Sequence, residues 1–229
     1  MKRICFLELQ PVPTTVGGGT THVLELSKEL IRLGYDVSVI TSSSGKEFDL
    51  DEGLDKLHLY PVGIIHRKIE DFRGFKRLFY YLWRLFFEIS FVFGANRILK
   101  KTKFDVIDAQ SPITTAFPCS LFARRFFITA HGIHHEGFKK LYLKKKDFFV
   151  SVIASRIYKT IEIFNIKRAE KVICLGKNTF DFYSKIKSSV IIPNGVDVKK
   201  FYMGDKNRKK VIISVSRFTE QKAIDKLIL

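Results

Sequence analysis

The sequence predicts an α/β protein with a mostly parallel β-sheet and helices on both faces of that sheet. Short apolar runs, typical of buried strands, alternate with longer segments whose apolar residues recur at spacings of three and four. Gly17, Gly18 and Gly19 stand between the first apolar run and the first helical pattern. Strand, glycine turn, helix and strand make a βαβ unit in this order, and repeated units of this kind build parallel sheets.

The first strand is expected over residues 3–9, a mostly apolar run. Pro11 and Pro13 end this strand, because proline cannot donate a hydrogen bond to a neighbouring strand. After the glycines, Thr20 or Thr21 is placed to cap the N-terminus of a helix with its hydroxyl group.

The helix that follows the glycines has one apolar face. Its members recur at helical spacing and are Val23, Leu26, Leu30 and Leu33. Gly34 comes where glycine commonly ends a helix, and residues 36–41 form the next strand. The glycine turn therefore lies at the carboxyl end of the first strand of a βαβ unit.

Two interpretations of the glycine turn follow from the residues alone. Gly17 and Gly18 lack a Cβ atom, so a ligand can approach their backbone closely, and a helix N-terminus at this place binds phosphates and other anions. The alternative is a turn that needs only unusual dihedral angles. A dinucleotide site is not expected, because His22 stands where the third fingerprint glycine belongs and the strand at 36–41 leads into no acidic residue.

The alternation of strands and helices continues through the rest of the chain. Strands are expected at residues 57–62, 104–109, 126–130, 171–175 and 190–192, and helices at 70–101 (one or two), 112–123, 147–168 and 178–184. The turn-rich stretch around Pro193, Asn194 and Gly195 is typical of a hinge. Beyond it, residues 211–215 begin a strand that we interpret as the start of a second α/β domain.

The composition limits the possible partners and the compartment. The 229 residues carry 40 basic and 23 acidic side chains, a formal net charge of +17 that favours anionic partners. Cys5, Cys119 and Cys174 have no metal-ligand spacing, so buried thiols in a reducing cytoplasm are the simplest interpretation. The short apolar run that Glu8 interrupts is not a signal peptide, and no uncharged stretch reaches the ~18 residues of a membrane span.

The segment at residues 70–101 is basic and aromatic. On a helical wheel its arginines Arg73, Arg77 and Arg84 share one sector, and its apolar residues Phe75, Phe79, Leu82, Phe86 and Phe93 lie opposite. Such a helix can lie on an anionic membrane, and a second basic run that includes Lys144 and Lys145 supports this interpretation. The alternative is a helix that covers the core while its arginines are solvated. A nucleic-acid partner is not expected, because no RNA- or DNA-binding motif is present.

Several motifs in the same order carry a resemblance to one family. They are the glycine turn with the helix that starts His22-Val23-Leu24-Glu25-Leu26, the strands Phe104-Asp105-Val106-Ile107 and Thr129-Ala130-His131-Gly132, the stretch Ile192-Pro193-Asn194-Gly195-Val196-Asp197, and Val215-Ser216-Arg217 with Lys222. Together they resemble the family 4 glycosyltransferases. The resemblance implies the two-domain GT-B architecture, with a Rossmann-like domain over residues 1–200 and the incomplete start of the donor-binding domain over residues 201–229.

The resemblance also implies roles for particular residues. Enzymes of this family transfer a sugar from a nucleotide diphosphate sugar with retention of configuration, usually without a metal or other cofactor. His131 would be the catalytic residue facing the donor sugar, Gly17 and Gly18 would lie against the donor, and Arg217 and Lys222 would neutralise its diphosphate. The acceptor would be a glycan or a lipid-linked molecule.

The chain also departs from the family pattern. Gly176 stands where serine is common, Asp108 and Gln110 stand where histidine is frequent, and Ala223 replaces a common glycine. The acidic donor-binding motif of the family is expected beyond Leu229. We therefore expect a cytoplasmic glycosyltransferase, peripheral on the inner face of the cell membrane, that is inactive as this chain alone. The alternative is a non-catalytic membrane- or partner-binding module derived from such a domain.

Overall fold

The computed structural model describes residues 2–14, 17–45, 50, 52–65, 76–123, 125–136, 148–198, 214, 215, 224 and 226, without the side chains of 76–82, 148–151 and 154. Several predicted site residues lie outside these ranges or lack a described side chain: Arg73, Arg77, Lys144, Lys145, Arg217 and Lys222. The chain divides into two compact units, Met1–Asn194 and Gly195–Leu229. The boundary falls within the residues expected to form the hinge.

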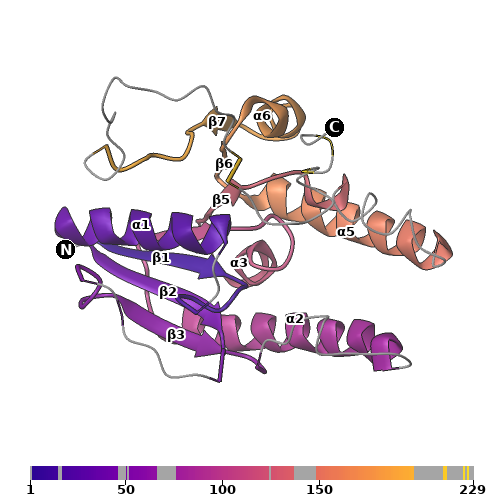
Figure 1. The fold of residues 1–229 in the computed structure, drawn as a ribbon, viewed down its shortest axis with the longest axis horizontal. Helices are drawn as coiled ribbons and strands as arrows, with labels where there is room; N and C mark the ends of the chain where they lie inside the picture. The colour runs from indigo at the N-terminus through magenta and orange to yellow at the C-terminus, as the bar shows by residue number, and fades with distance from the viewer. Residues whose placement is uncertain are drawn as a thin grey trace. The chain divides into compact units, whose positions relative to one another are not determined.

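The first unit is built on a parallel sheet, so the predicted α/β fold class is confirmed (Figure 1). Its seven described strands are β1 (Arg3–Glu8), β2 (Asp36–Ser42), β3 (His58–Val62), β4 (Val106–Ala109), β5 (Phe127–Ala130), β6 (Lys171–Cys174) and β7 (Ser189–Ile191). They lie in the order β3-β2-β1-β4-β5-β6-β7, and each neighbouring pair is parallel. The chain runs outward from β1 to β3 and then returns to β4, so β1 and β4 form the point where the strand order reverses.

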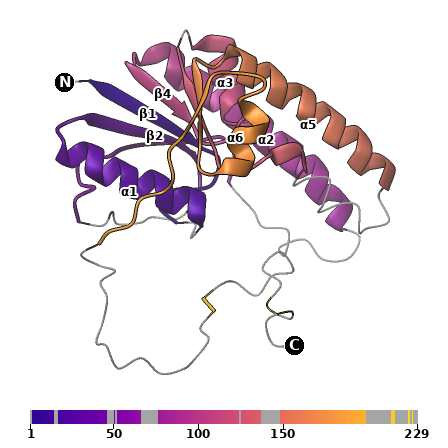
Figure 2. The ribbon, with the colours of Figure 1, turned by 90° about the horizontal axis from the view of Figure 1, so that it is seen from above.

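Helices cover both faces of this sheet (Figure 2). The described ones are α1 (Gly18–Arg32), α2 (Lys76–Lys101), α3 (Ala116–Phe122), α5 (Phe148–Arg168) and α6 (Lys177–Tyr183). Right-handed crossovers place α1 on one face and the later helices on the other. No helix in the described ranges combines the length and hydropathy needed to cross a bilayer.

Alternate residues of β1 divide the core into two clusters. Ile4 and Phe6 pack with Val23 of α1 on one face, whereas Cys5 and Leu7 belong to the cluster that contains Phe91 of α2 on the other. Side chains of a strand point alternately to its two faces, so a strand covered on both faces is apolar throughout. This is why residues 4–7 at the centre of the strand are all apolar.

The two ends of α1 differ in how well the sequence predicted them. Gly34 ends the helix with φ of +86°, and the N–H groups of Gly34 and Tyr35 donate to the Ile31 and Leu30 carbonyl groups at 3.0 Å, as predicted for a glycine stop. The prediction that Thr20 or Thr21 caps the start is wrong. The helix begins at Gly18 with Gly17 as its N-cap, and the Thr20 hydroxyl donates back to the Gly17 carbonyl at 2.9 Å.

The segment at residues 76–101 is one continuous helix, α2, whose buried face differs from the expected one. Phe87 and Phe91 are buried against the sheet, whereas Phe86 and Phe93 of the predicted apolar sector are 64% and 70% exposed. The interpretation that this sector covers the core is therefore wrong for these two residues.

A close approach between α2 and β3 depends on Gly94. A Cβ atom added at this position would lie 2.6 Å from Val62 Cβ and 3.2 Å from the Gly63 backbone nitrogen. Such distances require the helix or the strand to shift, because neither neighbouring atom is at the end of a flexible side chain.

We predict that Gly94→Ala lowers the free energy of unfolding by about 1–3 kcal/mol, the usual cost of overpacking a core. Denaturant unfolding followed by circular dichroism measures it. Gly18→Ala is the matched control, because a Cβ atom there meets no atom of the part of the chain that the structure describes within 4 Å, and its stability should equal or exceed that of the parent chain. Equal stability of Gly94→Ala and the control would show that the helix and strand are not closely packed.

Candidate active site

The candidate site lies at the carboxyl ends of β1, β4 and β5, where α1 begins. The first intrahelical bond of α1 runs from the Thr21 N–H to the Gly17 carbonyl at 2.9 Å, so the N–H groups of Gly18 and Gly19 precede the hydrogen-bonded ladder of the helix. These N–H groups and the helix dipole favour an anion at this end of α1. In parallel sheets, ligands bind outside the carboxyl ends of the strands, at the point where the strand order reverses.

His131 follows β5 directly, and a chain of polar side chains orients its ring. The Thr129 hydroxyl and the Gln110 amide both donate to Asp108 Oδ2, at 2.8 and 2.9 Å, within the buried end of the sheet. Because the Gln110 amide nitrogen is used in this way, its Oε1 faces His131 Nε2 at 3.0 Å and accepts a hydrogen bond from it. The neutral ring therefore carries its hydrogen on Nε2, and Nδ1 keeps its lone pair.

His22 connects α1 to His131. The two imidazole rings meet edge to face with their centroids 5.2 Å apart. Burial lowers the pKa of His22, and the nearby Asn194 side chain partly opposes this effect. Burial, followed by the neighbouring His22 and His134, lowers the pKa of His131 to about 4. Both rings are thus neutral at pH 7, and His131 acts as a hydrogen-bonding group rather than as a cation.

Two buried acids at strand ends are features that the sequence analysis did not assign to the site. Burial raises the pKa of Glu8, at the end of β1, to about 7, and that of Asp108, in the adjacent β4, also to about 7. Glu8 Oε1 accepts the Gln10 N–H at 3.0 Å, and its other oxygen would lie 3.5 Å from a Cβ atom at Gly19. An acid at the end of an apolar strand is the signal that could have identified both residues.

The structure brings together four of the predicted site residues. Gly17 and Gly18 lie at the start of the helix that carries His22, and His22 lies next to both His131 and Asn194. Gly195 belongs to the second compact unit. The roles of these residues, and those of Arg217 and Lys222, stay predictions. No group of three or more metal-ligating side chains gathers within the described ranges.

Solved structures share this arrangement of strands and helices. Sucrose-phosphate synthase from Thermosynechococcus elongatus superposes with a TM-score of 0.62 at 15% identity, over 88% of this chain and 50% of that one. The catalytic domain of starch synthase IV from Arabidopsis thaliana, bound to ADP and acarbose, gives 0.51 at 17% identity, over 87% and 52%. Medicago truncatula UGT71G1, complexed with UDP-glucose, gives 0.50 at 13% identity, over 91% and 54%. The chain spans about half the length of each.

These likenesses define the class of the fold, which is the Rossmann-like fold of GT-B glycosyltransferases. A search of curated protein sequences gave no significant match. A sequence profile of Glycosyltransferase Family 4 matches residues 16–200, which is most of the chain. The chain therefore belongs to glycosyltransferase family 4, as the motifs predicted.

We predict that the His131 imidazole stays neutral, as the Nε2–H tautomer, until the pH approaches 4. In the unfolded chain the same imidazole takes up its proton near pH 6.5. The free energy of unfolding therefore falls as the pH drops from about 6.5 to about 4, and this residue contributes at most about 1.4 kcal/mol per pH unit. Nitrogen-15 NMR of the histidine rings measures the tautomer and the titration directly.

His131→Gln is the matched variant for this measurement. It keeps an amide next to Gln110 and removes the titrating ring, so its stability should depend less on pH in this range. A His131 signal that becomes cationic above pH 6 would show that the ring is not held in the buried, neutral state.

Proposed function

We propose that this chain forms one half of a retaining glycosyltransferase, a hexosyltransferase that takes its sugar from a nucleotide diphosphate sugar. The observation that carries the proposal is the contact between His131 and His22, which places a strand-end histidine beside the helix that begins at Gly18. The two groups that the chemistry needs, an anion-binding backbone and a neutral imidazole, thereby meet at the carboxyl ends of the strands.

Each group has a role suited to its chemistry. The N–H groups at the start of α1 bind the donor at its diphosphate or sugar, and the absence of a Cβ atom at Gly17 and Gly18 lets the donor come close. The Nδ1 lone pair of His131 accepts a hydrogen bond from a sugar hydroxyl group. Departure of the nucleoside diphosphate leaves negative charge, which Arg217 and Lys222 neutralise without a metal ion.

Two features of the solved structures support a nucleotide-sugar donor and a second, donor-binding domain of the enzyme. Starch synthase IV holds ADP and UGT71G1 holds UDP-glucose, and this chain spans about half the length of each. We infer that the donor lies between the domain described here and a donor-binding domain joined to it at Asn194 and Gly195. The 229-residue polypeptide alone then offers the nucleotide only part of its site and does not transfer sugar. The acceptor in this proposal is a glycan or a lipid-linked molecule.

The proposal predicts that His131→Ala lowers turnover more than it weakens donor binding. In a longer polypeptide that carries the donor-binding domain, kcat should fall at least ~10-fold while the donor Kd changes less than ~3-fold, because the lost contact strengthens in the transition state. Transfer from a panel of UDP-, ADP- and GDP-sugars is measured together with donor binding.

His58→Ala is the control for this experiment, since His58 is exposed at the start of β3, at the opposite end of the strands from His131. The polypeptide of residues 1–229 is the second control and should give no product. An unchanged kcat for His131→Ala, or transfer by residues 1–229 alone, would remove His131 or the two-domain site from the proposal.

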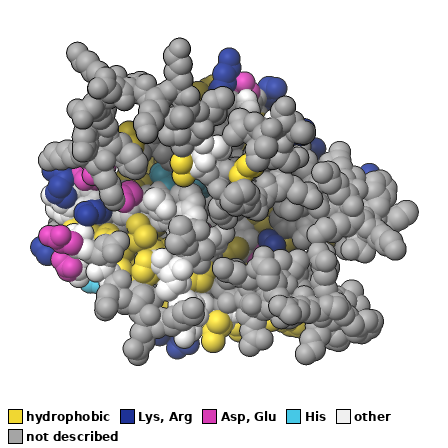
Figure 3. All heavy atoms as spheres, viewed as in Figure 1, with side chains coloured by type: hydrophobic (Ala, Val, Ile, Leu, Met, Phe, Trp, Pro, Cys, Tyr) yellow, Lys and Arg dark blue, Asp and Glu magenta, His cyan; other side chains and the backbone are white. Residues whose placement is uncertain are grey.

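A second candidate function is binding to an anionic membrane, either as part of the enzyme or as a non-catalytic module. The observation that favours it is the set of exposed apolar side chains on α2 and α5, the two longest described helices. These side chains are 41–70% exposed at Leu85, Phe86, Ile89 and Phe93 on α2 and at Ile153 and Ile157 on α5. Figure 3 shows hydrophobic side chains reaching the surface on one face of the molecule.

Positive charge accompanies these apolar side chains. Arg97 follows Phe93 by one helical turn, Arg156 precedes Ile157, and both arginines are exposed. The net charge of +17 acts in the same direction. Arg84, which the sequence analysis assigned to the membrane contact, instead pairs with Glu88 at 3.2 Å, so the apolar side chains rather than this arginine support the proposal.

We predict that vesicles containing anionic lipid retain the chain in a flotation assay and that Phe86→Ser combined with Phe93→Ser reduces the retained fraction severalfold. Interfacial binding scales with buried apolar area, and each basic residue near the surface adds about 1 kcal/mol. Leu33→Ser, at the exposed apolar C-cap residue of α1, is the control. Equal retention on neutral and anionic vesicles, or by the double variant, would exclude this function.

A further inference from the structure

We propose that Glu162 and Tyr183 act together as positioning residues, which hold the turn at residues 131–136, whose last three residues are helical, and thereby fix the direction of His131. Both side chains come from helices that lie beyond this turn in the sequence, and their hydrogen bonds reach Gly132, His134 and His135. The proposal rests on the proposed function in one respect, namely that His131 faces the donor sugar.

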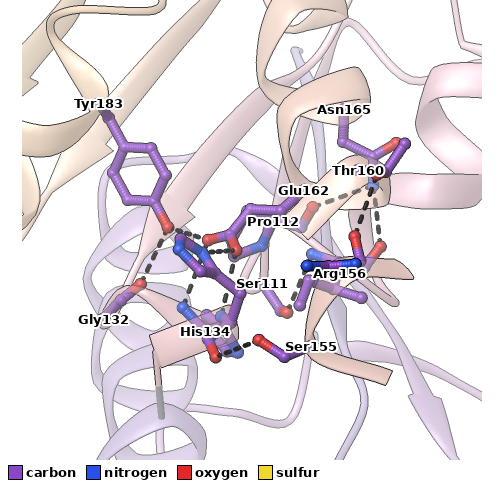
Figure 4. A network of polar contacts seen from close by, with 12 residues as sticks. Ser111, Pro112, Gly132, His134, Ser155, Arg156, Thr160, Glu162, Asn165 and Tyr183 are labelled. Atoms are coloured by element: carbon purple, nitrogen blue, oxygen red, sulfur yellow. Dashed lines mark hydrogen bonds and ion pairs between the residues drawn. The ribbon is translucent and has the colours of Figure 1, made fainter. Parts of the chain in front are cut away.

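The Glu162 carboxylate accepts hydrogen bonds from several N–H groups of the turn. It is 1% exposed on α5, and its two oxygens accept the His134 N–H at 3.3 Å and the His135 N–H at 3.2 Å. The His135 ring nitrogen Nδ1 lies 2.7 Å from Glu162 Oε2 and donates to it. A buried carboxylate is costly unless it is hydrogen-bonded, and here the backbone and side chain of one short turn supply three of its bonds (Figure 4).

Tyr183 connects this carboxylate to the residue that follows His131. Its hydroxyl group contacts Glu162 Oε1 and lies 3.1 Å from the Gly132 carbonyl oxygen. The ring is fully buried, and burial together with Glu162 raises the pKa of the phenol, so the hydroxyl keeps its proton. Figure 4 shows this hydroxyl group lying between Glu162 and Gly132.

These contacts restrain His131 from both sides along the chain. Ala130 precedes it as the last residue of β5, in register with Cys174 of β6. Gly132 follows it, and no atom of the described residues lies within 4 Å of a Cβ atom placed there, so no described side chain packs against this position. Glycine has wide backbone freedom, and the Tyr183 hydroxyl group, whose one proton is shared between Glu162 and this carbonyl oxygen, removes part of that freedom. The turn thereby becomes an extension of the rigid strand.

Two different sets of contacts hold His131, and they act on different parts of the residue. Glu162 and Tyr183, the clamp, contact the backbone of the turn, whereas Gln110 Oε1 lies 3.0 Å from Nε2 of the His131 ring. Loss of the clamp therefore leaves the tautomer of His131 set by Gln110 but lets the ring sample more than one direction relative to His22. Catalysis is sensitive to such misplacement, because a positioned group that moves by about 1 Å can cost ~100-fold in rate.

The test uses Tyr183→Phe, which removes one oxygen atom and keeps the buried ring. We expect the chain to stay folded, while the His131 ring signals shift or broaden and the nuclear Overhauser effect between the His22 and His131 rings falls at least twofold. In a longer polypeptide that carries a donor-binding domain, kcat should fall ~10-fold or more with the donor KM changed less than ~2-fold, the pattern of a lost transition-state contact.

Tyr158→Phe is the matched control, because the Tyr158 hydroxyl also donates to a carboxylate, Glu88 Oε2 at 3.4 Å, but between α5 and α2 and away from the turn. It should leave the His131 signals unchanged. If Tyr183→Phe does not fold, Glu162→Gln provides the same measurement, since the amide keeps the shape of the side chain but places an N–H group against the donors of the turn.

The outcomes separate this proposal from the proposed function. Unchanged His131 signals in a folded Tyr183→Phe or Glu162→Gln chain overturn the positioning role, as do equal effects of Tyr183→Phe and Tyr158→Phe. Altered His131 signals in a longer polypeptide that shows no sugar transfer support the positioning role and overturn the proposed function instead.

Discussion

The parallel pairing of β1 with β2 on one side and with β4 on the other is the interaction on which the rest of the structure depends. Six residues of β1, from Arg3 to Glu8, are paired in register with residues 36–41, and four of them are also paired with residues 106–109. The chain leaves this strand in one direction and returns on the other side, so the ends of β1 and β4 become neighbours. The Gln110 N–H then donates to the Leu7 carbonyl at 3.0 Å, which places Gln110 and its partners beside the start of α1.

Polar groups gather where this apolar sheet ends, and their burial decides their chemistry. The carboxyl groups of Glu8 and Asp108 keep their protons as the pH rises to about 7, whereas the His131 ring stays neutral as the pH falls to about 4. Burial acts in opposite directions on acids and bases because in each case it disfavours the charged form. Below about pH 7 the result is a set of neutral donors and acceptors beside a helix end that favours negative charge. Such a set can bind sugar hydroxyl groups and a diphosphate next to each other without cancelling either interaction.

The sequence predicted the elements well and the contacts between distant elements poorly. Apolar periodicity located each described strand within about two residues, and it identified Gly34 as a helix stop, because both depend on local backbone preferences. Periodicity groups residues on a face but does not say which face meets the sheet, so it assigned Phe86 and Phe93 of α2 to an apolar face that turns away from the core. Glu162 and Tyr183 escaped notice because their partners lie 21 to 51 residues away, and nothing local marks an acid that binds a distant turn.

The three buried thiols allow local unfolding of this fold to be followed by chemical labelling. Cys5 in β1, Cys119 in α3 and Cys174 in β6 are free, and each is 0% exposed. An alkylating reagent reaches a buried thiol when the surrounding structure opens, and opening occurs in cooperative units of different stability. The three sites sample the centre of the sheet, one covering helix and the far strands. The order in which they become labelled therefore reports which of these layers separates first, with no foreign probe added to the chain.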